Sequence, residues 1–100
     1  MQPHFTTDQT ERFLNYCAAE KIRVSTECKV LVNTLCRLAE PIDAVNLWLL
    51  LRSRRHRISV ATVYRLLNFL RQTGFVSKEK KAYAEFALYR WNEEVSENSG

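Results

Sequence analysis

The stretch that decides the fold is ISVATVYRLLNFLRQTGFV, residues 58–76. Its apolar side chains recur at three- and four-residue steps, the spacing of one helix face: Val63, Leu66, Leu67 and Leu70. Ser59 is a preferred N-cap residue, and Gly74 can adopt the left-handed conformation that closes a helix. The stretch therefore predicts a helix over 60–73, whose opposite side carries mostly polar residues: Ala61, Tyr64, Arg65, Asn68 and Gln72.

A two-stranded hairpin is expected directly after this helix. In this interpretation residues 75–78 form a short strand, 79–82 a turn, and 83–89 the return strand. The return strand alternates unevenly, but its aromatic side chains favour the strand conformation.

Before residue 58 the apolar spacing predicts three further helices: 9–21, 26–39 and 44–54. Each follows a residue whose side chain caps helices well: Asp8, Ser25 and Asp43. Pro41 ends the second of them, because the residue before a proline is disfavoured in the helical region. The third helix has a continuous apolar face that we expect to be buried: Ala44, Leu47, Trp48 and Leu51.

This order of elements is that of a mainly α, winged helix-turn-helix protein. It consists of a three-helix core, an added N-terminal helix, and a C-terminal two-stranded β-wing. The helix at 60–73 is then the recognition helix. A chain of 100 residues has room for one domain, which we expect at 8–91, between a flexible arm at 1–7 and an acidic flexible tail at 92–100.

The basic residues are concentrated around the predicted recognition helix. The whole chain carries a net charge of +4, but the segment from Arg52 to Lys81 holds nine basic residues and one acid, Glu79. Some precede the helix and others lie on the wing, where cationic side chains can hold DNA phosphates: Arg54, Arg55, Arg57, Lys78, Lys80 and Lys81. Double-stranded DNA is the expected partner; the alternative is a solvated basic face without a partner.

Residues 58–76 resemble the recognition helix of the ferric uptake regulator family. The resemblance is carried by Ala-Thr-Val-Tyr-Arg at 61–65, Leu-Asn at 67–68 and Gly-Phe-Val at 74–76. It extends more weakly over about 12–90, including residues 22–25 and 43–48. The resemblance implies a small DNA-binding transcriptional regulator, a repressor, that inserts this helix into the major groove.

The resemblance also implies roles for two neighbouring side chains of the helix. Tyr64 would contact a base, and Arg65 would bind a backbone phosphate. The alternatives are an aromatic side chain packed on the wing and a solvated surface arginine.

Four further residues of this helix are candidate DNA contacts: Ser59, Ala61, Thr62 and Asn68. Ser59 and Thr62 lie at the amino end, where hydroxyls and free amides can bind phosphate, although Ser59 is equally needed as a cap. Ala61 can touch a thymine methyl group or simply permit close approach, and Asn68 can pair with adenine.

The family's metal sites are not expected here. Family members usually carry a second, dimerising domain with His-rich metal ligands, whereas this sequence ends after the wing and has only His4 and His56. Its cysteines form no C-x-x-C pair, and we expect free thiols in a reducing cytoplasm: Cys17, Cys28 and Cys36. Cys28 lies in the first turn of a helix, where a reactive thiolate is favoured; the alternative is an inert thiol. No metal and no cofactor are predicted.

Leu49 and Leu50 are candidates for a partner interface. The inward face of their helix is already filled, so at least one of the two is expected to face outward. Such a surface would pair two copies in a homodimer or bind a partner protein, and the alternative function is a protein–protein interaction adaptor; otherwise another segment covers the leucines. The sequence contains no catalytic arrangement, signal peptide or membrane-spanning run, so neither an enzyme nor a membrane protein is expected.

Overall fold

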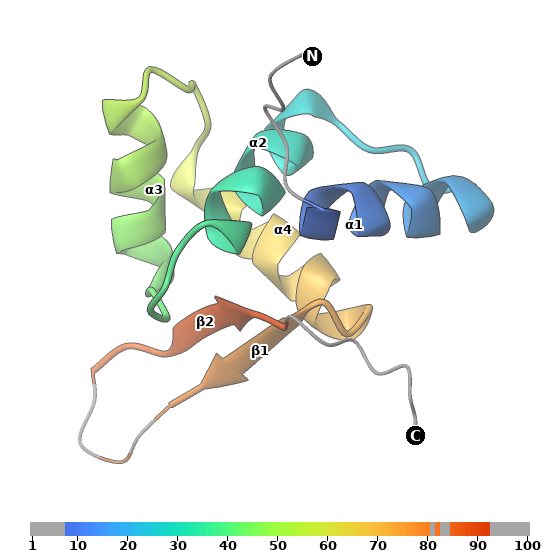
Figure 1. Ribbon diagram of the computed structural model, residues 1–100. Helices are drawn as coiled ribbons and strands as arrows, with labels where there is room; N and C mark the ends of the chain where they lie inside the picture. The colour runs from blue at the N-terminus through green and yellow to red at the C-terminus, as the bar shows by residue number, and fades with distance from the viewer. Residues whose placement is uncertain (1–7, 81, 83–84, 93–100) are drawn as a thin grey trace. The chain divides into compact units, whose positions relative to one another are not determined.

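The computed structural model describes residues 8–80, 82 and 85–92. These residues form four α-helices and one antiparallel pair of strands (Figure 1): α1 (Asp8–Ala19), α2 (Thr26–Cys36), α3 (Ala44–Ser53), α4 (Val60–Gln72), β1 (Val76–Glu79) and β2 (Leu88–Trp91). The predicted order of elements is confirmed, and the fold is a mainly α winged helix-turn-helix. The expected arm at 1–7 and all but the first residue of the expected tail at 92–100 lie outside the described residues.

The predicted N-caps of three helices are confirmed by their hydrogen bonds. The Ser25 hydroxyl accepts from the backbone N–H of Cys28 at 3.1 Å, and the Ser59 hydroxyl accepts from that of Thr62 at 3.1 Å. The Asp43 carboxylate accepts from the N–H of Asn46, also at 3.1 Å. Asp8 differs from the prediction, because it is the first residue of α1 rather than its cap. A carboxylate in the first turn still interacts favourably with the positive end of the helix dipole.

The carboxyl end of α1 closes in a way that the sequence did not indicate, and the end of α3, described with the arginine-rich turn below, closes in the same way. After α1, the N–H of Lys21 bonds to the carbonyl of Ala18 at 3.2 Å, and that of Ile22 to the carbonyl of Cys17 at 2.8 Å. This pair of bonds is the Schellman motif, whose left-handed residue is usually glycine. Here that residue is Lys21, with φ 59°. The motif ends α1 at Ala19, two residues before the predicted end at residue 21. Helix α2 also ends earlier than predicted, at Cys36 rather than at residue 39.

The chain divides into two compact units, and the first is Met1–Leu38. Within it α1 packs against α2. The buried apolar side chains of the two helices are Phe13, Cys17, Cys28, Leu31, Val32 and Leu35. Thr10 is also fully buried, and its hydroxyl donates to the side-chain oxygen of Asn33 at 3.3 Å. This bond keeps the buried hydroxyl of α1 satisfied against α2.

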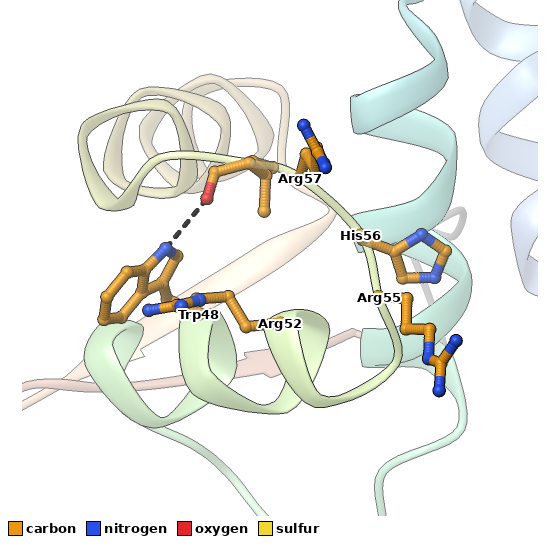
Figure 2. Close-up of a pocket in the computed structure, with 6 residues that line it drawn as sticks. Trp48, Arg52, Arg55, His56 and Arg57 are labelled. Atoms are coloured by element: carbon orange, nitrogen blue, oxygen red, sulfur yellow. Dashed lines mark hydrogen bonds between the residues drawn. The ribbon is translucent and has the colours of Figure 1, made fainter.

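The second unit, Ala39–Gly100, contains the helix-turn-helix pair and the wing. Here α3 and β1 each pack against α4. The buried residues include Leu47, Leu51, Ile58, Val63, Leu67, Leu70, Phe75 and Val76. Two predicted inward residues are only half-buried, Trp48 and Leu66. Trp48 differs because its indole lies at the edge of α3 beside the turn that leads to α4 (Figure 2).

The wing begins and ends later than predicted. Its strands pair from Val76 opposite Trp91 to Glu79 opposite Leu88, so the return strand is 88–91 and not 83–89. Phe75 and Trp91 stack with their ring centroids 5.4 Å apart, and this buried aromatic pair sets the register at the base of the hairpin. Residues 85–87, which we expected in the strand, are unpaired, and 83–84 lie outside the described residues.

Candidate nucleic-acid interface

One face of α4 is open to solvent. Its members repeat at helical spacing and are all exposed: Ala61, Tyr64, Arg65 and Asn68. Tyr64 has 46% of its surface exposed, although it is a large aromatic residue. The opposite face is anchored in the second unit by Val63, Leu67 and Leu70, each fully buried. The helix therefore presents the predicted set of side chains to solvent while its opposite face is held by the core.

At the amino end of α4, the two predicted hydroxyl residues are bonded to each other. The Ser59 hydroxyl donates to the hydroxyl oxygen of Thr62 at 2.9 Å while it accepts from the Thr62 backbone N–H. Ser59 therefore has the capping role that we considered as its alternative. A phosphate contact from either hydroxyl has to be compatible with this cap.

The arginine-rich turn before α4 is a tight helix closure. Arg55 has φ 69°, and its N–H bonds to the carbonyl of Arg52 at 2.9 Å, while the N–H of His56 bonds to the carbonyl of Leu51 at 3.1 Å. This is a second Schellman motif without glycine. The predicted phosphate-binding side chains of the turn are all exposed: Arg54, Arg55 and Arg57.

A pocket of about 610 Å³ lies between α3 and this turn (Figure 2), lined by Trp48, Arg52, Arg55, His56, Arg57 and Ile58. The indole N–H of Trp48 donates to the carbonyl oxygen of Ile58 at 2.8 Å. The guanidinium carbon of Arg52 lies 5.1 Å from the centroid of the Trp48 ring. Sequence reasoning assigned Trp48 to the core and placed Arg52 in the phosphate-binding turn, but it did not predict that the two side chains contact each other.

Tyr89 links the recognition helix to the wing and was missed by sequence reasoning. It is 7% exposed, and burial raises its pKa, an effect to which the nearby Tyr64 adds and which Arg71 opposes. Lys78 lies with its ammonium nitrogen 6.0 Å from the Tyr89 ring centroid. Side chains from α4 and β1 therefore meet at one residue of β2. Its only signal in the sequence was the aromatic content of 83–89.

The remaining predicted residues divide as follows. Lys78 and Lys80 are exposed, and Lys81 lies outside the described residues. Leu49 is 47% exposed, whereas Leu50 is half-buried, so one of the two leucines faces outward as expected. Phe86 was not predicted as a surface residue, yet it is 52% exposed.

The cysteines and histidines do not form a recognisable metal site in the part of the chain that the structure describes, where no three His, Cys, Asp or Glu residues gather. The three cysteines are thiols and are not joined in disulfides. Burial and the nearby Cys17 raise the pKa of Cys28 to about 11, which contradicts a reactive thiolate at this position. Among the helices in the described residues, none has the length and apolar character needed to span a membrane.

Solved structures of a peroxide-sensing regulator, a zinc uptake regulator and a ferric uptake regulator contain the same fold. PerR from Streptococcus pyogenes, described for peroxide sensing and gene regulation, matches with a TM-score of 0.78 and 26% identity over 85% of this chain and 58% of its own. A zinc uptake regulator complexed with zinc and DNA matches with a TM-score of 0.77 and 23% identity, over 94% of this chain and 62% of its own. The ferric uptake regulator Fur of Helicobacter pylori, described with three functional metal-binding sites, matches with a TM-score of 0.72 and 21% identity. The match covers 90% of this chain and 61% of the Helicobacter pylori protein.

This chain thus spans between 58% and 62% of the length of these three proteins. No curated protein matches it significantly. The sequence profile of the ferric uptake regulator family matches residues 19–97, which include α2, α3, α4 and both strands. On this match over most of its length, the chain belongs to the ferric uptake regulator family.

Proposed function

We propose that this protein is a transcriptional repressor that binds double-stranded DNA through α4. The observation that carries the proposal is the exposed face of α4, flanked on both sides by exposed cations. Six of the predicted cations are exposed in the described residues: Arg54, Arg55, Arg57, Arg65, Lys78 and Lys80. The sequence has no Asp or Glu between Asp43 and Glu79, so the four arginines of this set have no acidic neighbour along that stretch of the chain. Such a surface complements the phosphate backbone.

The proposed mechanism places α4 in the major groove. Tyr64 and Asn68 reach base edges, Ala61 permits close approach, and Arg65 binds a phosphate. The turn before α4 and the wing bind phosphates on either side, and the bound protein blocks a promoter in the cytoplasm. The domain at 8–91 has a small footprint, so specific binding requires a homodimer or a partner protein.

Salt dependence tests this function most directly. A duplex selected from a random pool is titrated with the protein at several salt concentrations, and complex size is measured in solution. If all six cations neutralise one phosphate each, log Kobs falls against log[salt] with a slope of about −5. The proposal fails if no sequence is enriched and no duplex binds at low salt.

A second candidate function is a protein–protein interaction adaptor, and the 47% exposure of Leu49 favours it. An apolar interface would respond little to salt, whereas DNA binding responds steeply. Leu49→Lys should leave stability within about 0.5 kcal/mol, because the side chain is largely exposed. If the leucine surface pairs two copies or binds a partner, this variant stays folded but is monomeric in sedimentation. Leu50→Lys is the comparison, and its half-buried position predicts a larger loss of stability.

A further inference from the structure

The pocket between α3 and the turn before α4 contains Arg52, a cation that lies over an aromatic ring and belongs to α3 rather than to the recognition helix. Arg52 lies in the last turn of α3, with its guanidinium 5.1 Å from the centroid of the Trp48 ring. Figure 2 shows its side chain lying along Trp48, whereas Arg55 and His56 extend from the other side of the turn. Arg52 is therefore the arginine of this pocket whose position is set by an aromatic contact.

Trp48 is itself held in place. Its indole N–H donates to the carbonyl of Ile58 at 2.8 Å, so the ring is fixed by the backbone just before the N-cap of α4. A guanidinium stacked on an aromatic ring keeps its N–H edge available for two parallel hydrogen bonds to an oxyanion. The pair is thus built to present that edge at the pocket without first ordering a flexible side chain.

The charge of the pocket indicates that its ligand is an anion. Its lining includes three arginines and one histidine but no carboxylate, and the nearest acids in the sequence are Asp43 and Glu79. A guanidinium edge can form two parallel hydrogen bonds with a carboxylate or with a phosphate, and phosphate is the anion that the proposed DNA partner carries. A pocket of about 610 Å³ is large enough to admit a phosphate group together with part of the molecule that carries it.

We propose that this pocket is a phosphate-binding site, in which Arg52 is the ligand and Trp48 is the positioning residue. The phosphate comes either from the DNA backbone beside the start of α4 or from a free phosphate. Only the first of these sources rests on the proposed DNA-binding function.

The DNA arm of the test compares Arg52→Gln with the matched control Arg12→Gln, an exposed arginine on α1. If Arg52 binds a backbone phosphate, its loss makes the slope of log Kobs against log[salt] shallower by about 0.9, which is about an eightfold weaker complex at 0.1 M salt if the two lines meet near 1 M. Arg12→Gln should leave the slope unchanged. Arg52→Lys keeps the charge and should recover most of the slope.

The second arm needs no DNA. Inorganic phosphate is titrated into the free protein against chloride at constant ionic strength, and the indole N–H resonance of Trp48, assigned with Trp48→Phe, is followed by NMR. A saturable shift that disappears in Arg52→Gln and persists in Arg12→Gln shows that the pocket binds a phosphate group through Arg52.

The two arms separate the outcomes. A reduced salt slope without a saturable phosphate shift assigns the phosphate to DNA, and a saturable shift with an unchanged slope assigns it to a free ligand. If the Arg52→Gln slope equals that of the unmodified protein and phosphate gives no saturable shift, the proposal is wrong while the proposed function stands. If no DNA binds at all, the phosphate titration alone decides, and its failure overturns the site.

Discussion

The indole N–H of Trp48 donates a hydrogen bond to the carbonyl oxygen of Ile58 across 2.8 Å. This bond ties the middle of α3 to the residue that precedes Ser59, the N-cap of α4. The Schellman motif at Arg55 closes α3 locally, but it does not by itself determine where the chain begins the next helix. A side chain of the first helix of the helix-turn-helix pair therefore helps to place the start of the recognition helix.

Removing this hydrogen bond should lower stability. Trp48→Phe keeps an aromatic ring but leaves the Ile58 carbonyl without its side-chain donor, and we expect a loss of about 1–2 kcal/mol in the free energy of unfolding. Urea denaturation measures the change. Tyr64→Phe is the control, because it removes a polar group from an exposed aromatic side chain and should change stability by less than about 0.5 kcal/mol. Equal effects of the two substitutions would contradict the role assigned to Trp48.

We expect the Arg55 side chain to contribute to DNA binding while the backbone conformation of this residue lowers the stability of the fold. Its φ of 69° is unfavourable for a residue with a Cβ, so Arg55→Gly should stabilise the fold by about 0.5–1 kcal/mol. The same substitution should weaken DNA binding, because it removes a predicted phosphate contact. Lys21→Gly is the matched control, since Lys21 occupies the same position after α1 with φ 59°. It should stabilise the fold equally and leave DNA affinity unchanged; a parallel loss of affinity would show that the Arg55 side chain is not specifically required.

Tyr64 and Arg65 should contribute to DNA binding in different ways. Tyr64→Ala should cost about 1–3 kcal/mol of binding free energy and relax base preference at one position, because Tyr64 is proposed to read a base edge. Arg65→Ala should weaken binding to all sequences similarly and make the salt slope shallower by about one unit. Selection from a random pool with each variant separates the two effects. Equal and sequence-independent losses for both variants would mean that Tyr64 packs on the wing rather than reading a base.

Stability should fall in the alkaline range. Burial, with a contribution from Cys17, raises the pKa of Cys28 from 9.0 in the unfolded reference to about 11 in the folded protein. A raised folded pKa contributes stability below the unfolded value, and this stability is lost as pH rises from about 9 to about 11, because only the unfolded thiol ionises readily there. The pKa values of Cys17 and Tyr89 are also raised by burial and act in the same direction.

The variant Cys28→Ala isolates this contribution. Its absolute stability differs because packing changes, so the quantity compared is the slope of the free energy of unfolding against pH, measured by urea denaturation. We expect a shallower decline above pH 9 than in the unmodified protein. Parallel curves would show that Cys28 ionises equally in the folded and unfolded states.

The order of helices and most of their beginnings follow from local chemistry in the sequence. Ser25, Asp43 and Ser59 accept hydrogen bonds from amides three residues later, which depends only on the residue type and a helical backbone after it. The outward face of α4 follows equally from the spacing of Val63, Leu67 and Leu70. Gly74, with φ 90°, ends α4 as predicted, because glycine carries no steric penalty in that conformation.

Tertiary structure decided the features that no local preference specifies. Lys21 and Arg55 take the left-handed conformation without glycine, because burial of the neighbouring helices outweighs a local penalty of about 1–2 kcal/mol. The register of the wing depends on the stacking of Phe75 with Trp91, residues that are distant in the sequence. The pocket likewise requires Trp48 to meet the carbonyl of Ile58 and Arg52 to lie on the indole. Spacing along a chain specifies which side of a helix is apolar, but pairing between separate segments is set by the shapes that pack together.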